Sequence, residues 1–490
     1  MTADNVRGAK AWIWPAIFCG YFAAQAVYRW LIGGGLGLDE SELFLAADHL
    51  SWGYGPQPPL YAWLQWALFQ VIGDPLLALS LLKNALLCTT YLAVYTLLRS
   101  SVAPMHAGLA TLGLILLPQI GWESQRALSH SVLATAMAAL TCLVFWTQVL
   151  RERRGAYALF GLLLGLGLIS KANYALVPPA LCVAAATIPE LRRKLRPLGL
   201  AVSAAIAAAI AAGPLLWVLR NRDLAMSSLG KLDIAETGMP VWQTALASAA
   251  ALGEAALAFA ALPLVVAGLI VWRCRDRANP APPASPVSLE VFLTRAILIG
   301  LGLTLILAVA SGAGQVKDRW LQPVLFLFGP LIGMWLLARV TPRGRIWWGR
   351  VAATCALLVT IMLPVELVTG TPGNPARGGA PIEAIGEDLA ASYPEIATVV
   401  GDPEWVAANL QYRKPDLQVT PAHSARLAAG ETALLIWMDE AARGSRLATR
   451  IGERSGGTLE LDETATFSHP YPWQPDVAFT LNAATLHRPE

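Results

Sequence analysis

The feature that most constrains this chain is a series of apolar runs, many of about 18 residues or more, separated by polar segments. Runs of this length are typical of helices that cross a bilayer, where every backbone polar group must be satisfied within the segment. Of the 490 residues, 56% are hydrophobic and only 14% are charged, whereas soluble domains carry about 25% charged residues. We therefore predict an α-helical polytopic membrane protein with about eleven transmembrane helices, near residues 11–32, 75–98, 105–120, 128–150, 156–170, 173–189, 198–219, 246–272, 291–311, 320–338 and 348–366.

The distribution of basic residues predicts the orientation of these spans. Arginines and lysines precede the first span and follow the second, fourth, sixth, eighth and tenth: Arg7, Lys10, Arg99, Arg151, Arg153, Arg154, Arg192, Arg193, Lys194, Arg196, Arg273, Arg275, Arg277, Arg339, Arg343, Arg345 and Arg350. If the spans alternate, all of these lie on one side, which the positive-inside rule identifies as the cytoplasm. The N-terminus is then cytoplasmic, and the long loops 33–74 and 220–245 face outward together with the C-terminal tail. The net charge of +3 does not indicate a nucleic-acid partner.

The chain divides into two predicted domains. Residues 1–370 form the transmembrane domain, and residues 371–490 form a small extracytoplasmic α/β domain. In the latter we expect strands near 396–400 and 434–437, and helices near 404–412 and 439–449. Within the first loop, 33–74, two further helices are expected, near 43–52 and 59–72, because apolar and aromatic residues recur there at helical spacing.

The strongest local signal is the acidic segment 38–42, which reads Leu-Asp-Glu-Ser-Glu directly after the first span. It is followed by Trp-Gly-Tyr at 52–54 and by a Pro-Pro pair at 58–59. One interpretation is a solvated acidic loop in which Asp39 caps a helix. The other is a site for a substrate half embedded in lipid, in which Asp39 acts as a general base.

The order of these motifs, ending with Gly-Asp at 73–74, resembles the first loop of the GT-C superfamily of glycosyltransferases. Within that superfamily it is most similar to the group of protein O-mannosyltransferases and aminoarabinose lipid A transferases, glycosyltransferase families 39 and 83. The resemblance covers residues 11 to about 366. It implies a sugar donor linked to polyprenyl phosphate and a glycolipid or glycan acceptor such as lipid A or lipopolysaccharide. It also implies a periplasmic active site in a bacterial inner membrane, with membrane lipids around the chain.

By this resemblance Asp39 is the base, assisted electrostatically by Glu40 or Glu123. Many relatives carry an aspartate near the start of the helix after the third span, but here residues 129–131 read Ser-His-Ser. Either Glu123 supplies the second acidic function, or His130 contacts the substrate. The expected reaction is a direct displacement at the anomeric carbon with inversion.

Four basic residues are candidates for binding the phosphate of the donor: Lys83, Lys171, Lys317 and Arg319. The segment 317–323 resembles the family segment in which basic residues meet the lipid phosphate, Lys83 aligns with a basic family position, and Lys171 ends a Gly-rich span similar to that of the family. Lys171 lies at a break between two apolar runs, where a charged residue is usually functional. Snorkelling to the membrane surface is the alternative for Lys83 and Lys171.

Tyr54 and Gln57 in the first loop are further candidates for substrate contacts. Gln57 stands where relatives often have histidine or lysine, so it brings hydrogen bonds without charge.

No cofactor is predicted, although Asp39 with Glu123 can in principle hold a divalent ion. The six cysteines show no spacing typical of zinc sites. Two other classes remain open, a lipid or oligosaccharide transporter and a noncatalytic subunit of an envelope assembly. Transporters usually show internal repeats and charges near mid-bilayer, which this sequence lacks.

Glu254 is the one acid in an Ala-rich apolar stretch. It tests the predicted boundary of the eighth span, because Glu254 is interfacial if that span begins at residue 255.

Overall fold

The computed structural model describes residues 11–227, 241–277, 285, 287–312 and 316–490. The chain forms two compact units, and each is described by itself. Unit 1 comprises residues 1–28, 49–73 and 80–360, and unit 2 comprises residues 29–48, 74–79 and 361–490. Unit 2 is therefore larger than the predicted domain 371–490, because two segments from the first third of the chain pack with it.

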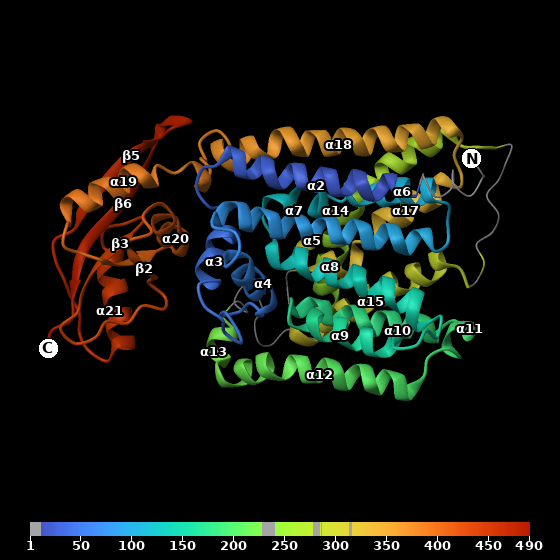
Figure 1. The fold of residues 1–490 in the computed structure, drawn as a ribbon, viewed down its shortest axis with the longest axis horizontal. Coiled ribbons are helices and arrows are strands. Elements are labelled where there is room, and N and C mark those ends of the chain that lie inside the picture. The colour runs from blue at the N-terminus through green and yellow to red at the C-terminus, as the bar shows by residue number, and fades with distance from the viewer. Residues whose placement is uncertain (1–10, 228–240, 278–284, 286, 313–315) are drawn as a thin grey trace. The chain divides into compact units, whose positions relative to one another are not determined.

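Most of the chain up to residue 369 is helical (Figure 1). The first elements are α2 (Ile13–Ile32), α3 (Leu38–Ala46), α4 (Leu60–Phe69), α5 (Pro75–Arg99), α6 (Pro104–Thr111), η1 (Leu112–Leu114), η2 (Gln119–Glu123), α7 (Ser124–Arg126), α8 (Ser129–Val144), η3 (Phe145–Val149), α9 (Ala156–Leu168), η4 (Ala172–Leu176) and α10 (Val177–Ala186). They are followed by α11 (Pro189–Arg192), α12 (Pro197–Arg220), α13 (Arg222–Ala225), α14 (Val241–Cys274), α15 (Leu289–Ser311), η6 (Asp318–Leu321), α16 (Gln322–Leu325), α17 (Phe328–Leu337) and α18 (Pro342–Thr369).

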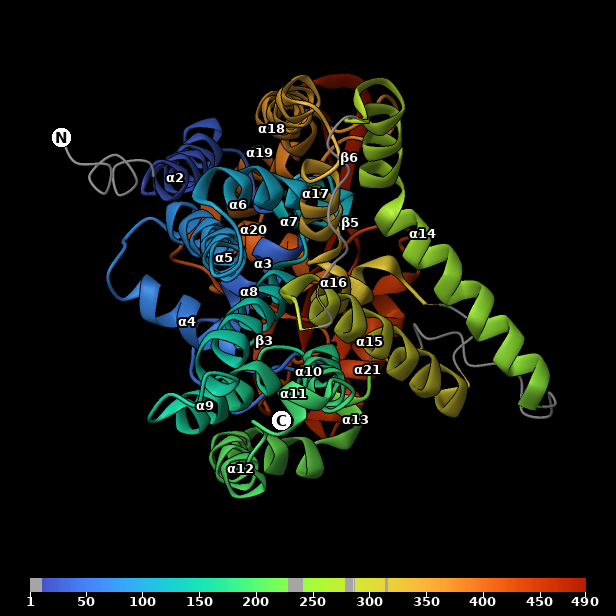
Figure 2. The same cartoon turned by 90° about the vertical axis from the view of Figure 1, so that its right-hand side faces the viewer.

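Six helices in the described part of the chain are long and apolar enough to cross a membrane, or up to eight if each of two bent pairs counts as one span. The predicted number of about eleven is not confirmed. Two of the predicted spans correspond to the shorter apolar helices at 156–168 and 172–186. Figures 1 and 2 show α2, α5, α12 and α18 running in nearly the same direction, with α14 inclined to them.

Two apolar helices are broken near their middles. The chain bends by 80° between residues 104–114 and 119–126, and by 53° between residues 318–325 and 328–337. The two broken helices meet backbone to backbone at Gly113 and Gly329, where a Cβ on either glycine would lie 2.3 or 2.2 Å from the carbonyl oxygen of the other. Only glycine permits this approach. The breaks therefore lie side by side and bring polar backbone into the interior of unit 1.

Helix α14 contains the predicted eighth span, 246–272, and extends beyond it at both ends. It contains 34 residues, which at 1.5 Å per residue makes it about 51 Å long, well beyond a hydrocarbon core of about 30 Å. Glu254 lies exposed inside this helix rather than before its first residue. Because the helix is longer than this layer, Glu254 lies outside the hydrocarbon if the span begins at residue 255, and the insertion cost of its charge is then small.

The C-terminal part of unit 2 is a mixed sheet in the order β2-β1-β3-β6-β4, with β5 paired to β6. Strands β1, β2 and β3 are parallel, and β6 is antiparallel to its three neighbours. The strands are β1 (Thr398–Asp402), β2 (Gln418–Pro421), β3 (Thr432–Trp437), β4 (Glu460–Leu461), β5 (Ala465–Tyr471) and β6 (Gln474–His487), and the accompanying helical elements are η7 (Arg377–Gly379), α19 (Ile382–Ser392), α20 (Glu404–Arg413) and α21 (Arg443–Ser455). Alternating strand residues pack against α19 and α20 on one face and against α21 on the other. The predicted small α/β fold is confirmed.

The predicted helix at 43–52 is misplaced, because α3 spans residues 38–46 instead. Gly37 is its N-cap, and Asp39 and Glu40 both lie in its first turn. Acidic side chains there are favoured by the positive end of the helix dipole. The aromatic helix predicted at 59–72 is present as α4.

Candidate active site

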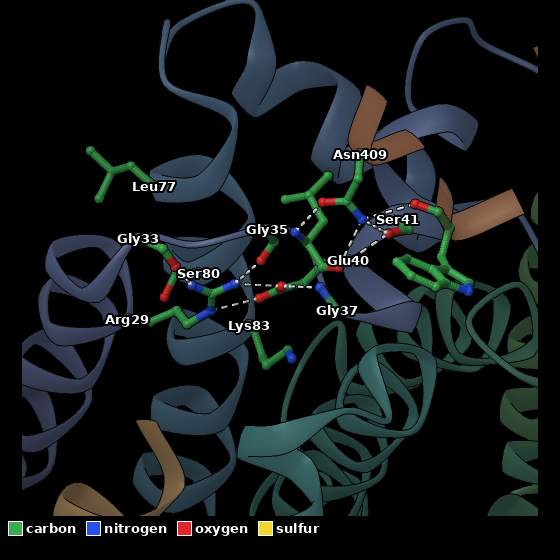
Figure 3. A network of polar contacts seen from close by, with 12 residues as sticks. Arg29, Gly33, Gly35, Gly37, Glu40, Ser41, Leu77, Ser80, Lys83 and Asn409 are labelled. Atoms are coloured by element: carbon green, nitrogen blue, oxygen red, sulfur yellow. Dashed lines mark hydrogen bonds and ion pairs between the residues drawn. The ribbon is translucent and has the colours of Figure 1, made fainter. Parts of the chain in front are cut away.

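Arg29 binds the acidic segment of unit 2 (Figure 3). The guanidinium of Arg29 donates to Oε1 and Oε2 of Glu40, at 3.1 and 2.8 Å, and to the carbonyl oxygens of Gly33 and Gly35, at 2.7 and 3.1 Å. Oε2 of Glu40 also accepts the backbone N–H of Gly37 at 2.8 Å. The ion pair is largely buried, with side chains 12% and 10% exposed. Glu40 thereby fixes the chain that leads from α2 into α3.

A second anchor for the same segment comes from α20. Asn409 accepts the N–H of Leu36 at 2.6 Å and donates to the carbonyl oxygens of Leu36 and Trp405, at 3.0 and 2.8 Å. Its amide also donates to Oγ of Ser41 at 3.3 Å (Figure 3). A buried side chain on the C-terminal sheet domain therefore braces the start of α3. No local motif marks Asn409 in the sequence.

These contacts give Asp39 and Glu40 different environments. Neighbouring residues of an α-helix point about 100° apart, so two adjacent carboxylates do not face the same side. Glu40 is buried and bound to Arg29, whereas Asp39 is only half-buried in the first turn of α3. The structure thus ties Glu40 to the backbone and leaves Asp39 as the more accessible acid of the pair.

Unit 1 contains a buried polar cluster around the segment 124–131. Nζ of Lys83 donates to the carbonyl oxygen of Gln125 at 3.4 Å, and Nε2 of Gln125 donates to Oδ1 of Asn84 at 3.1 Å. At the other end of the segment, Nζ of Lys171 donates to Oγ of Ser131 at 2.6 Å. Two of the predicted cations therefore contact the same stretch of chain. Lys83 is buried and Lys171 half-buried.

The predicted basic segment at 317–319 joins this cluster through its neighbours. The amide of Asn173, two residues after Lys171, donates to the carbonyl oxygen of Trp320 at 2.7 Å. Nε2 of Gln119 donates to Oδ2 of Asp318 at 2.8 Å. Lys317 and Arg319 flank that aspartate and are half-buried. These contacts connect the segment 318–320 with Gln119 and Asn173, so Lys317 and Arg319 lie next to residues that contact this part of unit 1.

Several side-chain amide atoms in this cluster have no hydrogen-bond partner among the residues that the structure describes. They are both amide atoms of Gln65 and the amide oxygens of Gln119, Asn173 and Gln322. Buried polar atoms in folded proteins are almost always paired, so such a concentration requires an explanation. Ordered water or a polar ligand would supply such partners.

The remaining predicted residues of unit 1 have clear partners. Glu123 pairs with Arg126 at 2.7 Å, and both side chains are partly exposed, at 34% and 41%. His130 is buried, and its ring lies against that of Tyr61, with centroids 5.4 Å apart. Of the two alternatives for this loop, His130 is the one that belongs to the buried cluster.

Tyr54 and Gln57 close a tight turn in the first loop, where the backbone N–H of each donates to the carbonyl oxygen of the other at 3.1 Å. The hydroxyl of Tyr54 donates to the carbonyl oxygen of His49 at 2.6 Å and accepts the N–H of Ser51 at 2.8 Å. Burial raises the pKa of Tyr54 above its usual value, so the phenol stays neutral. Its observed contacts are those of a residue that shapes the loop.

Within the described ranges, no group of three or more histidine, cysteine, aspartate or glutamate side chains is arranged to hold a metal ion. The charges available to an anionic ligand in the buried cluster are therefore those of lysine and arginine.

Comparisons with known proteins define the class of this chain. Residues 56–217 match the family model described as dolichyl-phosphate-mannose-protein mannosyltransferase. The structure matches that of ArnT from Cupriavidus metallidurans bound to undecaprenyl phosphate, with a TM-score of 0.60 and 13% identity, over 96% of this chain and 98% of that one. The fold is therefore that of the GT-C glycosyltransferases, as the motifs of the first loop predicted.

Two curated relatives narrow the class to a family. Lipopolysaccharide core galacturonosyltransferase RgtB of Rhizobium johnstonii is 30% identical over 450 residues, which are 89% of each chain. RgtA of the same organism, with the same described activity, is 27% identical over 480 residues, or 93% of each chain. The chain belongs to this family of bacterial membrane glycosyltransferases and is a glycosyltransferase. The alternatives of a transporter and of a noncatalytic subunit are thereby set aside.

Proposed function

We propose that this enzyme transfers galacturonic acid from polyprenyl phosphate to the core of lipopolysaccharide, at the periplasmic face of a bacterial inner membrane. The observation that carries the proposal is the similarity to RgtA and RgtB along about nine tenths of all three chains, since both relatives are described as galacturonosyltransferases of the lipopolysaccharide core. The polyprenyl carrier is supported by the ArnT structure, which holds undecaprenyl phosphate. The distribution of basic residues supports a cytoplasmic N-terminus.

The reaction is a single displacement at the anomeric carbon. The acceptor hydroxyl oxygen attacks that carbon while the carboxylate of Asp39 takes the hydroxyl proton. A new glycosidic C–O bond forms, the bond from the anomeric carbon to the phosphate oxygen breaks, and its electron pair leaves with the polyprenyl phosphate. One displacement inverts the anomeric configuration.

The leaving phosphate is a weak base, so it needs compensating charge rather than a general acid. Lys83, Lys317 and Arg319 supply that charge. Support comes from the contact of Lys83 with Gln125 and from the position of Lys317 and Arg319 on either side of Asp318, which accepts from Gln119. Glu40 acts as a positioning residue through Arg29. His130 contacts the substrate from the buried cluster, whereas Arg126 already neutralises Glu123 at a more exposed place.

The test is transfer by the purified protein in liposomes, with polyprenyl-phosphate galacturonic acid as donor and lipopolysaccharide core as acceptor. The proposal predicts an acceptor mass increased by one hexuronate residue, and release of polyprenyl phosphate in equal amount. Donor that crosses the bilayer without formation of a glycoside contradicts it. A second reaction with free lipid A as acceptor reports the acceptor preference, and faster transfer to lipid A than to core contradicts the assignment to the core.

A further inference from the structure

Helix α4 presents a polar face that is completely buried. Tyr61 and Gln65 lie one turn apart on it, and each is 0% exposed. Neither Nε2 nor Oε1 of Gln65 has a hydrogen-bond partner among the described residues. A buried carboxamide left without partners is costly, and an apolar side chain of similar size avoids that cost. The carboxamide at this position therefore points to a ligand that carries both a donor and an acceptor.

The contacts of α4 show which elements lie next to this face. Residues four apart in a helix share one side, and the ring of Tyr61 lies 5.4 Å from that of His130 in α8. The N–H of Leu60, at the start of α4, donates to the carbonyl oxygen of Ile169 at 3.1 Å. Ile169 lies two residues before Lys171. Leu60 and Tyr61, at the start of α4, thus lie between the first turn of α8 and the chain that carries Lys171, and Gln65 lies one turn further along the same side of α4.

The start of α8, beside Lys171, favours the binding of an anion. Helix α8 begins at Ser129, after Leu128 has turned the chain through a left-handed conformation with φ of 62°. The positive end of the dipole of this 16-residue helix lies there. The ammonium group of Lys171 is 2.6 Å from Oγ of Ser131 in the same turn and brings a positive charge to the start of the helix. A helix start, a lysine and a buried carboxamide together match a ring that carries one carboxylate and several hydroxyl groups.

We propose that this is the subsite for the hexuronate ring of the donor. Lys171 and the start of α8 bind the sugar carboxylate, and Gln65 donates to one ring hydroxyl and accepts from another. The inference rests on the proposed galacturonosyl transfer and adds the residues that select the sugar. It moves Lys171 from the phosphate to the carboxylate and leaves the phosphate to Lys83, Lys317 and Arg319. Lys83 bonds to Gln125 and Lys171 to Ser131, so the two lysines serve different parts of the donor.

The test compares two donors on the protein in liposomes, polyprenyl-phosphate galacturonic acid and polyprenyl-phosphate galactose. These sugars differ only at C6, which is a carboxylate in galacturonic acid and a hydroxymethyl group in galactose. Lys171→Met is expected to lower kcat/KM for the uronate donor about 100-fold and for the neutral donor less than about threefold, because a hydrogen bond to a charged group is lost only with the uronate. Lys171→Arg retains most of the uronate preference, since it retains the charge.

Two further variants separate the subsites. Lys83→Met, which acts on the phosphate, lowers kcat/KM for both donors by the same factor. Gln65→Met also lowers both equally, by about tenfold or more, because both sugars carry the hydroxyl groups. Full activity of Gln65→Met with both donors overturns the role of Gln65.

Three further outcomes test the proposed carboxylate subsite. An equal fall for both donors in Lys171→Met overturns it and returns Lys171 to the phosphate. If that variant does not fold, the wild-type protein decides, since equal use of the two donors by the wild type overturns a carboxylate subsite. A wild-type protein that transfers neither sugar contradicts the proposed function itself, which is a different result from transfer without donor preference.

Discussion

Replacing Arg29 by methionine should loosen the segment that carries Asp39, while methionine retains an apolar side chain at position 29. Arg29 binds both carboxylate oxygens of Glu40 and the carbonyl oxygens of Gly33 and Gly35. Methionine offers no donor, so all four acceptors lose this partner. Glu40 then keeps only the N–H of Gly37 among these bonds.

The size of the effect follows from the burial of the pair. Removing one partner of a fully buried ion pair costs about 3–5 kcal/mol, mostly because the other charge remains uncompensated. Here the two side chains are 12% and 10% exposed, and water reaches part of the freed carboxylate. We therefore expect the variant to lose about 3 kcal/mol of local stability in residues 33–41. This loss corresponds to roughly a 100-fold rise in the population in which the segment is open.

Hydrogen exchange followed by mass spectrometry measures this local opening directly. The matched control is Arg126→Met, which breaks the more exposed pair with Glu123, where the side chains are 41% and 34% exposed. An exposed pair is worth at most about 1 kcal/mol, so exchange near residue 123 should change little. Glu40→Gln and the double variant complete a cycle whose coupling energy should exceed about 1 kcal/mol.

Unchanged exchange of residues 33–41 in Arg29→Met would refute the reasoning, as would a coupling energy near zero. Either result would mean that the segment is held without the ion pair. In that case Glu40 would be available for a direct catalytic role, and its assignment as a positioning residue would fall.

Three other expectations can be checked in simpler assays. Gly34→Ala should lower the stability of unit 2 by about 1–2 kcal/mol or more, because φ is +80° and the new Cβ would lie 2.9 Å from the carbonyl oxygen of Gly378. Gly373→Ala, with φ of +75° but open space around the Cβ, isolates the backbone contribution in the same thermal-melting assay. Gly113→Val should abolish the yield of monodisperse protein in size-exclusion chromatography, because even a Cβ would lie 2.3 Å from the carbonyl oxygen of Gly329. Transfer should persist in excess EDTA, because lysine and arginine side chains balance the phosphate charge; loss of activity that Mg²⁺ or Mn²⁺ restores would contradict this.

The sequence predicted those features that depend on local pattern. Apolar runs identified the helical membrane class, and the aromatic spacing after the Pro-Pro pair predicted α4. In the C-terminal region, buried runs predicted β1 and β3, and the helix predicted after residue 439 is present as α21, starting at Arg443. The motif order of the first loop led to the correct superfamily. Each of these signals lies within one continuous stretch of the sequence.

Features that depend on distant segments were not predictable. Asn409 contacts Leu36 across 373 positions of sequence, and nothing near either residue marks the contact. The bends in two apolar helices and the backbone contact between Gly113 and Gly329 join distant segments, and hydropathy along the sequence shows neither of them. Gln65 looks like one polar residue in an aromatic helix until its burial is known.

The most direct test of the proposed mechanism compares the wild-type protein with Asp39→Asn, which keeps the size of the side chain and removes the base. Both proteins receive polyprenyl-phosphate galacturonic acid and lipopolysaccharide core in liposomes, and product formation is measured beside donor binding. We predict that Asp39→Asn binds the donor with wild-type affinity and forms product at least about 1,000-fold more slowly. Transfer at the wild-type rate by Asp39→Asn would contradict the account.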